Sequence, residues 1–386
     1  MALAPQLEEF RVYTLLYSAL KNMGDFLIYE RTKELLRKHK GMQDYVEIHG
    51  RRESLGTHLD RVNATKAVII CGGPGTVWNM YPGKYQLATN LDDIKVPIII
   101  MGTGWFGVPG DDATLAQYGF NASTMRLFQR ATANGRMIGV RDHLTERALT
   151  NNGISNVLMT GCPSWYDLDH LDGEFHAPNP VKTVVFTPPA RRIFSDQAVE
   201  VMRVLRRLFP DARLFCSFHR GLAQDEQTPE REAQWLGELA QRAGDLGYEV
   251  VDASYGLENA LFYEDCDLHV GYRVHGHLYF LAKRKPSFLV QEDGRGRGAS
   301  EALGLPDIRG WERTAFGRVA ARVKEPRFSY FLEKRGMDVR ARGAVPSELE
   351  RYIGRETESG FAGFKELSQT FRRHYGTMVR FLESIP

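Results

Sequence analysis

Residues 67–75 read Ala-Val-Ile-Ile-Cys-Gly-Gly-Pro-Gly, and this stretch decides the fold. Its first five residues are apolar and partly β-branched, which predicts a buried strand, and the glycines after them predict a tight turn. The same order returns in residues 96–104, Val-Pro-Ile-Ile-Ile-Met-Gly-Thr-Gly. Continuously apolar strands that alternate with helices are typical of a parallel sheet with helices on both faces.

The pattern continues on both sides of these two strands. Residues 12–17 form a further apolar run, for which periodicity alone leaves strand and helix open. The other strands expected in this half are 137–140 and 157–160, and the expected helices are 26–40 and 144–151.

A second series of the same kind follows residues 169–180, a polar stretch rich in turn residues that is the best candidate for a linker. The expected strands are 183–186, 213–216, 248–251, 268–271 and 287–290, and the expected helices are 196–208, 230–246, 257–263 and 276–283. We therefore predict an α/β fold with two Rossmann-like domains, residues 1–175 and 176–345. A helical C-terminal segment, residues 346–386, is expected to pack on them.

The composition excludes several classes of protein. The 386 residues include 50 Lys and Arg against 48 Asp and Glu, which gives a net charge of +2. A protein that binds nucleic acid through its overall charge is usually far more basic, so this class is excluded. The four cysteines form no CxxC pair, so we expect neither a disulfide framework nor a metal site. No signal peptide and no long apolar run stand out, and we therefore expect a cytoplasmic protein.

The C-terminal segment carries apolar residues at helical spacing, among them Phe371, Met378 and Phe381. A helix that packs on a domain is the simplest interpretation of this pattern. Arg372 and Arg380 lie nearby, which leaves contact with the inner face of a membrane open as the alternative.

Glycine turns at the carboxyl ends of parallel strands are places where a ligand can approach the backbone. Residues 102–107 spell GxGxxG, but no acidic residue follows at the distance that a dinucleotide site requires. Residues 108–110, Val-Pro-Gly, also oppose an immediate helix. We therefore expect neither a dinucleotide site here nor a P-loop, since the Walker lysine pattern is absent from the sequence.

The stretch 271–277, Gly-Tyr-Arg-Val-His-Gly-His, offers the strongest chemical signal. The guanidinium of Arg273 is planar and permanently charged, and it can donate two parallel hydrogen bonds to a carboxylate or a phosphate. His275 follows at the expected start of a helix, where it can act as a general acid or base and where backbone N–H groups favour an anion. The alternative is that these polar residues only cap the helix.

Two further basic clusters follow strands of the same predicted sheet. They are Arg191 with Arg192, and His219 with Arg220. Three basic clusters at one sheet edge would surround an anionic ligand, although each alone is also typical of a solvated loop. The glycine-rich stretch 292–300 after the last strand is expected to be a flexible loop, either a closing segment or a linker. Asp25 and Asp142 lie at strand-to-helix turns, where a carboxylate caps the helix or faces a ligand.

Together these motifs resemble the polysaccharide pyruvyl transferase family. The resemblance covers about residues 12 to 305 and is most specific in Asp265-Cys-Asp-Leu268, Arg273-Val-His-Gly276 and Ala282 to Pro286. It is also carried by Asn22-Met-Gly-Asp25, Gly72-Gly-Pro-Gly75, Gly102 to Gly107 and Gly139-Val-Arg-Asp142.

The resemblance implies a GT-B-like pair of domains that face each other across a cleft. It also implies an enzyme that moves a pyruvyl group from phosphoenolpyruvate to two hydroxyls of a sugar in a glycan or glycolipid, with no cofactor. His275 would match the family's catalytic histidine, and Arg273 and Arg191 would hold the donor. The neighbouring residues expected on the donor side are Arg192, His219, Arg220, Gly276 and His277.

The acceptor is expected to bind the first domain, near its glycine turns. The residues expected to take part are Asp25, Gly73, Gly75, Gly104, Trp105 and Arg141. Trp78 or Trp105 can stack on a sugar, although a tryptophan is as readily explained by packing. Two other functions stay open, a GT-B glycosyltransferase that uses a nucleotide sugar and a non-catalytic carbohydrate-binding protein. The sequence leaves the oligomeric state and the acceptor sugar undetermined.

Overall fold

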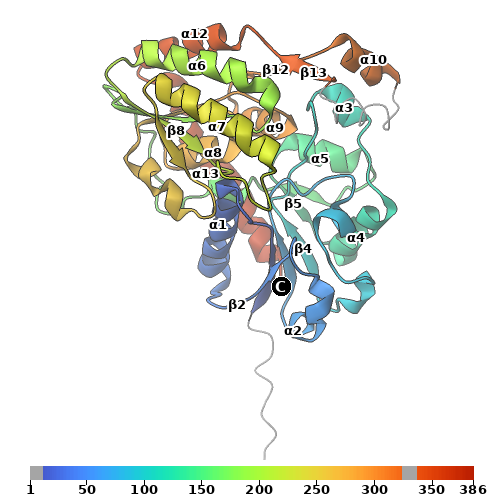
Figure 1. The fold of residues 1–386 in the computed structure, drawn as a ribbon. Coiled ribbons are helices and arrows are strands. Elements are labelled where there is room, and N and C mark those ends of the chain that lie inside the picture. The colour runs from blue at the N-terminus through green and yellow to red at the C-terminus, as the bar shows by residue number, and fades with distance from the viewer. Residues whose placement is uncertain (1–11, 324–336) are drawn as a thin grey trace, which may run out of the picture.

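The computed structural model describes residues 12–323 and 337–386. The first ten residues, in which no signal peptide is expected, lie outside this part of the chain. Within the described ranges the chain forms one parallel sheet in its first half and another in its second half, both flanked by helices (Figure 1).

The first sheet has the strand order β2-β1-β3-β4, with every neighbouring pair parallel. β5 and β6 pair in parallel and continue the sheet beyond β4 through a bridge between Thr103 and Val140. The strands are β1 (Tyr13–Tyr17), β2 (Tyr45–His49), β3 (Val68–Cys71), β4 (Ile98–Met101), β5 (Ile138–Val140) and β6 (Val157–Met159). The helices are α1 (Met23–Lys40), α2 (Leu59–Asn63), α3 (Asp112–Ala116), α4 (Ala122–Thr132) and α5 (His143–Thr150). β3 and β4 are buried along their whole length, which explains their continuously apolar sequences.

The second sheet has the order β11-β10-β7-β8-β9 and is also parallel throughout. Its strands are β7 (Thr183–Thr187), β8 (Arg213–Phe218), β9 (Glu249–Asp252), β10 (Leu268–Gly271) and β11 (Ser287–Leu289). The helices of this half are α6 (Ser195–Leu208), α7 (Glu230–Asp245), α8 (Val274–Ala282), α9 (Gly294–Leu303) and α10 (Ala315–Val323). β8 pairs with one edge of β7, and β10 pairs with the opposite edge. The strand order therefore reverses between β7 and β10. Ligands of such sheets bind at this reversal, at the carboxyl ends of the strands.

The predicted α/β fold class is confirmed, with two successive Rossmann-like parallel sheets along the chain. Residues 12–17 contain the strand β1, which resolves that ambiguity, and the helix expected at 257–263 has the tighter 3-10 form (η7, Glu258–Asp265). The sequence analysis missed β2, α4 and the antiparallel pair β12 (Trp311–Arg313) and β13 (Val339–Ala341).

The flexible loop expected at residues 292–300 is wrong, because most of this stretch belongs to α9. Asp293 caps the helix by accepting a hydrogen bond from the backbone N–H of Arg295 at 2.9 Å. The glycines serve close packing: a Cβ at Gly298 would lie 2.6 Å from Cγ of Asp142, and one at Gly294 would lie 2.7 Å from the Trp105 ring. Their spacing therefore reflects contact with the first domain and not flexibility.

The C-terminal segment is helical, as predicted. α12 (Val345–Glu358) packs on α6, and α13 (Leu367–Ser384) returns to the first domain, where it contacts α1 and β6 (Figure 1). Lys40 at the end of α1 donates a hydrogen bond to the carbonyl of Ile385 at 2.7 Å. Phe371, Met378 and Phe381 are buried in this contact, so the packing interpretation is confirmed.

Within the described ranges, each helix is too short or too polar to cross a membrane.

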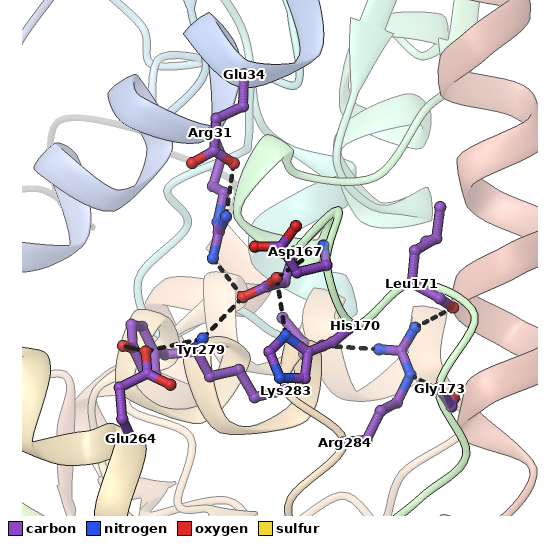
Figure 2. A network of polar contacts seen from close by, with 12 residues as sticks. Arg31, Glu34, Asp167, His170, Leu171, Gly173, Glu264, Tyr279, Lys283 and Arg284 are labelled. Atoms are coloured by element: carbon purple, nitrogen blue, oxygen red, sulfur yellow. Dashed lines mark hydrogen bonds and ion pairs between the residues drawn. The ribbon is translucent and has the colours of Figure 1, made fainter. Parts of the chain in front are cut away.

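A buried carboxylate joins the two halves of the chain (Figure 2). Asp167, whose side chain is 1% exposed, accepts hydrogen bonds from Arg31 of α1 at 2.5 Å and from His170 at 3.0 Å, and pairs with Lys283 after α8 at 3.0 Å. Burial alone would raise the pKa of Asp167, but these partners outweigh it and lower the pKa to about 2. Arg284 adds to the junction by donating to the carbonyls of Leu171 and Gly173.

We expect Asp167→Asn to lower the free energy of unfolding by about 3 kcal/mol or more, because it leaves two half-buried cations without their shared counter-charge. Urea denaturation followed by circular dichroism measures this change. Glu34→Gln is the matched control, since Glu34 pairs with the same Arg31 at 2.6 Å from a more exposed position and should cost less than about 1 kcal/mol. Equal midpoints for Asp167→Asn and the wild type would contradict this account of the junction.

Candidate active site

The candidate site lies where the carboxyl edge of the first sheet meets that of the second. Asn22 and Met23 at the start of α1 contact the second domain: Oδ1 of Asn22 accepts a hydrogen bond from Arg273 at 3.0 Å, and the Met23 N–H donates to the carbonyl of His219 at 3.1 Å. A Cβ at Gly24 would lie 2.4 Å from Nδ1 of His275. The motif 22–25 therefore holds the two sheets together and makes room for the histidine.

His275 lies in the first turn of α8, directly after the reversal between β7 and β10. Its side chain is buried, and no described residue offers a hydrogen-bond partner to its Nε2. Burial lowers the pKa of His275 well below its usual range, and the charges of Arg141, Arg295 and Arg273 act in the same direction. The imidazole is therefore neutral near pH 7 before a ligand binds.

Three guanidiniums from three different elements carry charges that act on this imidazole. Arg273 is the N-cap residue of α8, and burial together with the nearby charge of Arg220 lowers its pKa to about 10. Arg141 follows β5 and is 3% exposed, yet its Nη1 and Nη2 have no hydrogen-bond partner in the part of the chain that the structure describes. A Cβ at Gly104 would lie 1.9 Å from Nε of Arg141, so the glycine turn makes the room that this side chain occupies.

Arg295 completes this group from the first turn of α9. Its Nε and Nη2 donate to the two carboxylate oxygens of Asp293 at 2.9 and 2.6 Å, and its guanidinium lies 4.7 Å from the centre of the Phe106 ring. These contacts fix the position of the Arg295 guanidinium. The sequence predicted only a flexible loop here, and no arginine of this stretch was expected in the site.

Glu292 organises the turn after β7. Its carboxylate is buried and accepts hydrogen bonds from the backbone N–H groups of Ala190 at 3.0 Å and Arg191 at 3.1 Å. Burial raises the pKa of Glu292, while the charge of Arg273 opposes that shift. Glu292 thus connects the segment after β11 to the turn after β7 by hydrogen bonds. These two strands lie on opposite sides of the reversal.

The other arginines that were predicted on the donor side differ in where they lie relative to these three guanidiniums. The Arg191 guanidinium faces Asp338 at 3.9 Å, and its Nη1 is buried without a hydrogen-bond partner among the described residues. Arg191 is not among the charges that act on His275. Arg192 and Arg220 are exposed on neighbouring turns. The roles expected for these three residues stay predictions.

His219 and His277 are both buried but differ in surroundings. His219 bonds the hydroxyl of Tyr263 through Nε2 at 2.8 Å and lines a narrow pocket with Arg273. His277 lies in the core, where its Nδ1 bonds Oγ of Ser287 at 2.7 Å. His269 bonds the same hydroxyl at 2.7 Å, so His277 supports the strands beneath the site.

Gly276, between the two histidines of this turn, is closely packed. A Cβ there would lie 3.0 Å from Nε2 of His269 and 3.1 Å from Cε1 of His219. The backbone of α8 therefore approaches both buried rings at this position.

The two glycine turns of the first sheet interlock beside the site. The Gly104 N–H donates to the carbonyl of Gly73 at 2.9 Å, and a Cβ at Gly75 would lie 2.8 Å from Oγ1 of Thr103. Trp105 is fully buried and packs edge-on against Tyr118. It is therefore a core residue, as the packing alternative predicted.

Of the tryptophans considered for sugar stacking, Trp78 is the exposed one, at 61%. Asp25 is half-buried in the first turn of α1, where Asn22 takes the cap position. Asp142 does cap α5, since its carboxylate accepts a hydrogen bond from the Thr145 N–H at 2.7 Å.

Lys84 is a residue of this region that the sequence analysis missed. Burial lowers its pKa to about 8, the charges of Arg51, Arg295 and Arg141 act in the same direction, and Asp25 opposes them. Lys84 follows Pro82 and Gly83 in a turn, and nothing in that pattern distinguishes it from a surface lysine. The whole arrangement can hold a small, highly anionic molecule against a neutral, buried imidazole.

Comparison with known proteins adds a family and a set of folds. The family model described as polysaccharide pyruvyl transferase matches residues 22–294. No curated protein matches the chain.

Among solved structures, HepE of Anabaena in complex with UDP and glucose is similar with a TM-score of 0.49 and 10% identity, over 97% of this chain and 100% of that one. A putative UDP-N-acetylglucosamine 2-epimerase from Listeria monocytogenes is similar with a TM-score of 0.48 and 10% identity, over 96% of this chain and 94% of that one.

Proposed function

The chain belongs to the polysaccharide pyruvyl transferase family and is a transferase, and from that premise we propose that it transfers the pyruvyl group of phosphoenolpyruvate to two hydroxyls of a sugar in a glycan or glycolipid. The observation that supports this proposal most directly is the set of three guanidiniums, those of Arg141, Arg273 and Arg295, whose charges act on the buried imidazole of His275. Phosphoenolpyruvate carries a phosphate and a carboxylate on one small carbon frame, and fixed guanidiniums are the groups best suited to both.

In the proposed reaction His275 acts as the general acid. Its proton goes to the methylene carbon of the donor, C2 becomes electrophilic, and a sugar hydroxyl adds to C2. The proton of that hydroxyl returns to His275. The second hydroxyl adds to C2 as the bond from C2 to the phosphate oxygen breaks, and its proton leaves with inorganic phosphate. The guanidiniums neutralise the leaving phosphate as charge develops on it.

The electrostatics of the site give His275 a reason to be protonated only when the donor is bound. Without a ligand, burial and the charges of Arg141, Arg295 and Arg273 keep the pKa of His275 low. A bound phosphate and carboxylate would oppose those charges and raise the pKa. The acid would therefore form in the complex in which it is needed.

The acceptor is assigned in this proposal to the first domain. Gly73, Gly75 and Gly104 lie at the carboxyl edge of its sheet, and the Gly104 turn adjoins Arg141. Asp25 lies one residue after the glycine that contacts His275. A sugar bound here would present its hydroxyls to a donor held by the second domain.

Donor binding tests the proposal directly by calorimetry with phosphoenolpyruvate and a panel of nucleotide sugars. We expect phosphoenolpyruvate alone to bind, and Arg273→Ala to weaken it by about 10- to 100-fold, because a charge-assisted hydrogen bond to an anion is lost. Arg213→Ala is the matched control, since Arg213 is exposed at the opposite end of the same sheet. A nucleotide sugar that binds, with no response to phosphoenolpyruvate, would contradict the proposal and favour a glycosyltransferase.

A further inference from the structure

An open pocket of about 470 Å³ lies on the first domain, apart from the residues that surround His275. It is lined by Arg51, which follows β2, and by Asn79, Gly83, Lys84 and Gln86, which follow β3. A pocket of this size accommodates a small ligand rather than a single ion. The function proposed above uses none of these five residues.

The pocket lies beside the reversal of strand order in the first sheet, which is where parallel sheets bind their ligands. β1 lies between β2 and β3, so the strand order reverses between β1 and β3. The segments that line the pocket follow β2 and β3 at their carboxyl ends, beside this reversal. The two domains therefore each have a charged site at their own reversal, and the charges of Asp25, Arg141 and Arg295 act on Lys84 in the pocket of the first domain.

The pocket is cationic, and the carboxylate of Asp25, which acts on Lys84, is not part of its lining. None of its five lining residues is acidic. Across the described ranges, neither the Arg51 guanidinium nor the Lys84 ammonium takes part in a hydrogen bond or ion pair. Burial lowers the pKa of Lys84, the charge of Asp25 opposes that shift, and the charge of Arg51 acts in the same direction as burial.

Asn79 adds a hydrogen-bond donor in a fixed orientation. Its Oδ1 accepts hydrogen bonds from the Gly83 N–H at 3.0 Å and from the side-chain amide of Asn121 at 3.0 Å. Because the oxygen is occupied, the side-chain NH₂ group is the part of the amide that remains for a ligand. The pocket thus offers donors and positive charge, which is the recognition chemistry of an anion.

We infer that this pocket binds a phosphate group that is part of the acceptor, so that the enzyme acts on a phosphorylated sugar rather than a neutral one. The assignment of the phosphate to the acceptor rests on the proposed function, whereas the anion site itself does not. Two cations with no acidic neighbour in the pocket match a doubly charged phosphate better than a singly charged carboxylate. A phosphate anchored at Arg51 and Lys84 would fix the position of the attached sugar on the first domain.

The test is a calorimetric titration of methyl phosphate into the full-length protein, with phosphoenolpyruvate present to occupy the donor site. We expect binding in the wild type and a loss of affinity of about tenfold or more in Arg51→Ala and in Lys84→Gln, because each removes one charge from the anion site. Arg52→Ala is the matched control, since Arg52 is the neighbour of Arg51, is exposed as Arg51 is, and does not line the pocket. Methyl phosphate affinity should be unchanged in that variant.

The outcomes separate this inference from the proposed function. A dependence on Arg51 and Lys84 that persists when phosphoenolpyruvate is left out supports the anion site even if the donor proves to be different. Equal methyl phosphate affinity in Arg51→Ala and the wild type would overturn the inference, as would a loss of binding in Arg273→Ala but not in Arg51→Ala. Binding of glucuronate through Arg51 without binding of methyl phosphate would also overturn it.

Discussion

Replacing His275 with alanine is expected to lower kcat for pyruvyl transfer by about 10²- to 10⁴-fold, the range that a general acid contributes. The loss follows because the variant lacks the imidazole that supplies the proton in the space beside Gly24. Phosphoenolpyruvate should still bind, since Arg141, Arg273 and Arg295 remain. A steady-state assay of phosphate release measures the first effect, and calorimetry the second.

Proton uptake distinguishes an acid from a residue that only shapes the site. The free imidazole is neutral because burial and three cations lower its pKa, and donor binding is expected to raise that pKa. Near pH 7 the wild type should therefore take up a proton on binding phosphoenolpyruvate, which appears as a dependence of the binding heat on the buffer. His275→Ala should lack this uptake. Equal uptake in both proteins, or a retained kcat in the variant, would contradict the assignment.

The free energy of unfolding is expected to fall steeply as the pH drops below about 6.5, the pKa of histidine in an unfolded chain. The cause is a set of buried histidines in the second domain, each with its pKa lowered mainly by burial: His219, His269, His275 and His277. The pKa of His277 falls to about 3. Below about pH 6.5 the unfolded chain binds protons that the folded chain does not, so stability is lost as the pH falls.

Each of these histidines contributes a slope of up to about 1.4 kcal/mol per pH unit, and all four together up to about 5 kcal/mol per unit. Glu292, whose pKa is raised, opposes this with a single group. Urea denaturation at pH 7.5, 6.5 and 5.5 measures the slope. His277→Gln should reduce it by about one proton, whereas His143→Gln should not, because the His143 side chain is exposed to solvent. A slope of less than one proton between pH 6 and 5 would contradict the prediction.

The sequence predicted most of the two sheets because strands buried on both faces leave a strong signal. β3 and β4 are continuously apolar for that reason. β2 was missed because its first three residues are partly or fully exposed, so its side chains follow no apolar run. α9 was missed because glycines at 294, 296 and 298 are usual in flexible loops, and only the three-dimensional structure shows what each packs against.

The site was predictable in part. Arg273 and His275 follow a clear strand, and the order of strands brings them to the reversal of the sheet. Lys84 and Arg51 could not be found this way, because they belong to ordinary turns and gain their significance from neighbours that are distant in sequence. The direction of the Arg191 side chain toward Asp338 depends on a contact between residues 147 positions apart, which no local pattern encodes.

The return of α13 to the first domain means that this domain is assembled from both ends of the chain. Trp165 packs against Phe371 and His374, and His39 bonds the Tyr375 hydroxyl at 2.7 Å. During synthesis on the ribosome, the first sheet must wait until the entire second domain has been translated before its last apolar face is covered. Residues 1–175 expressed alone would expose that face. A truncated protein that contains the first domain therefore also needs α13.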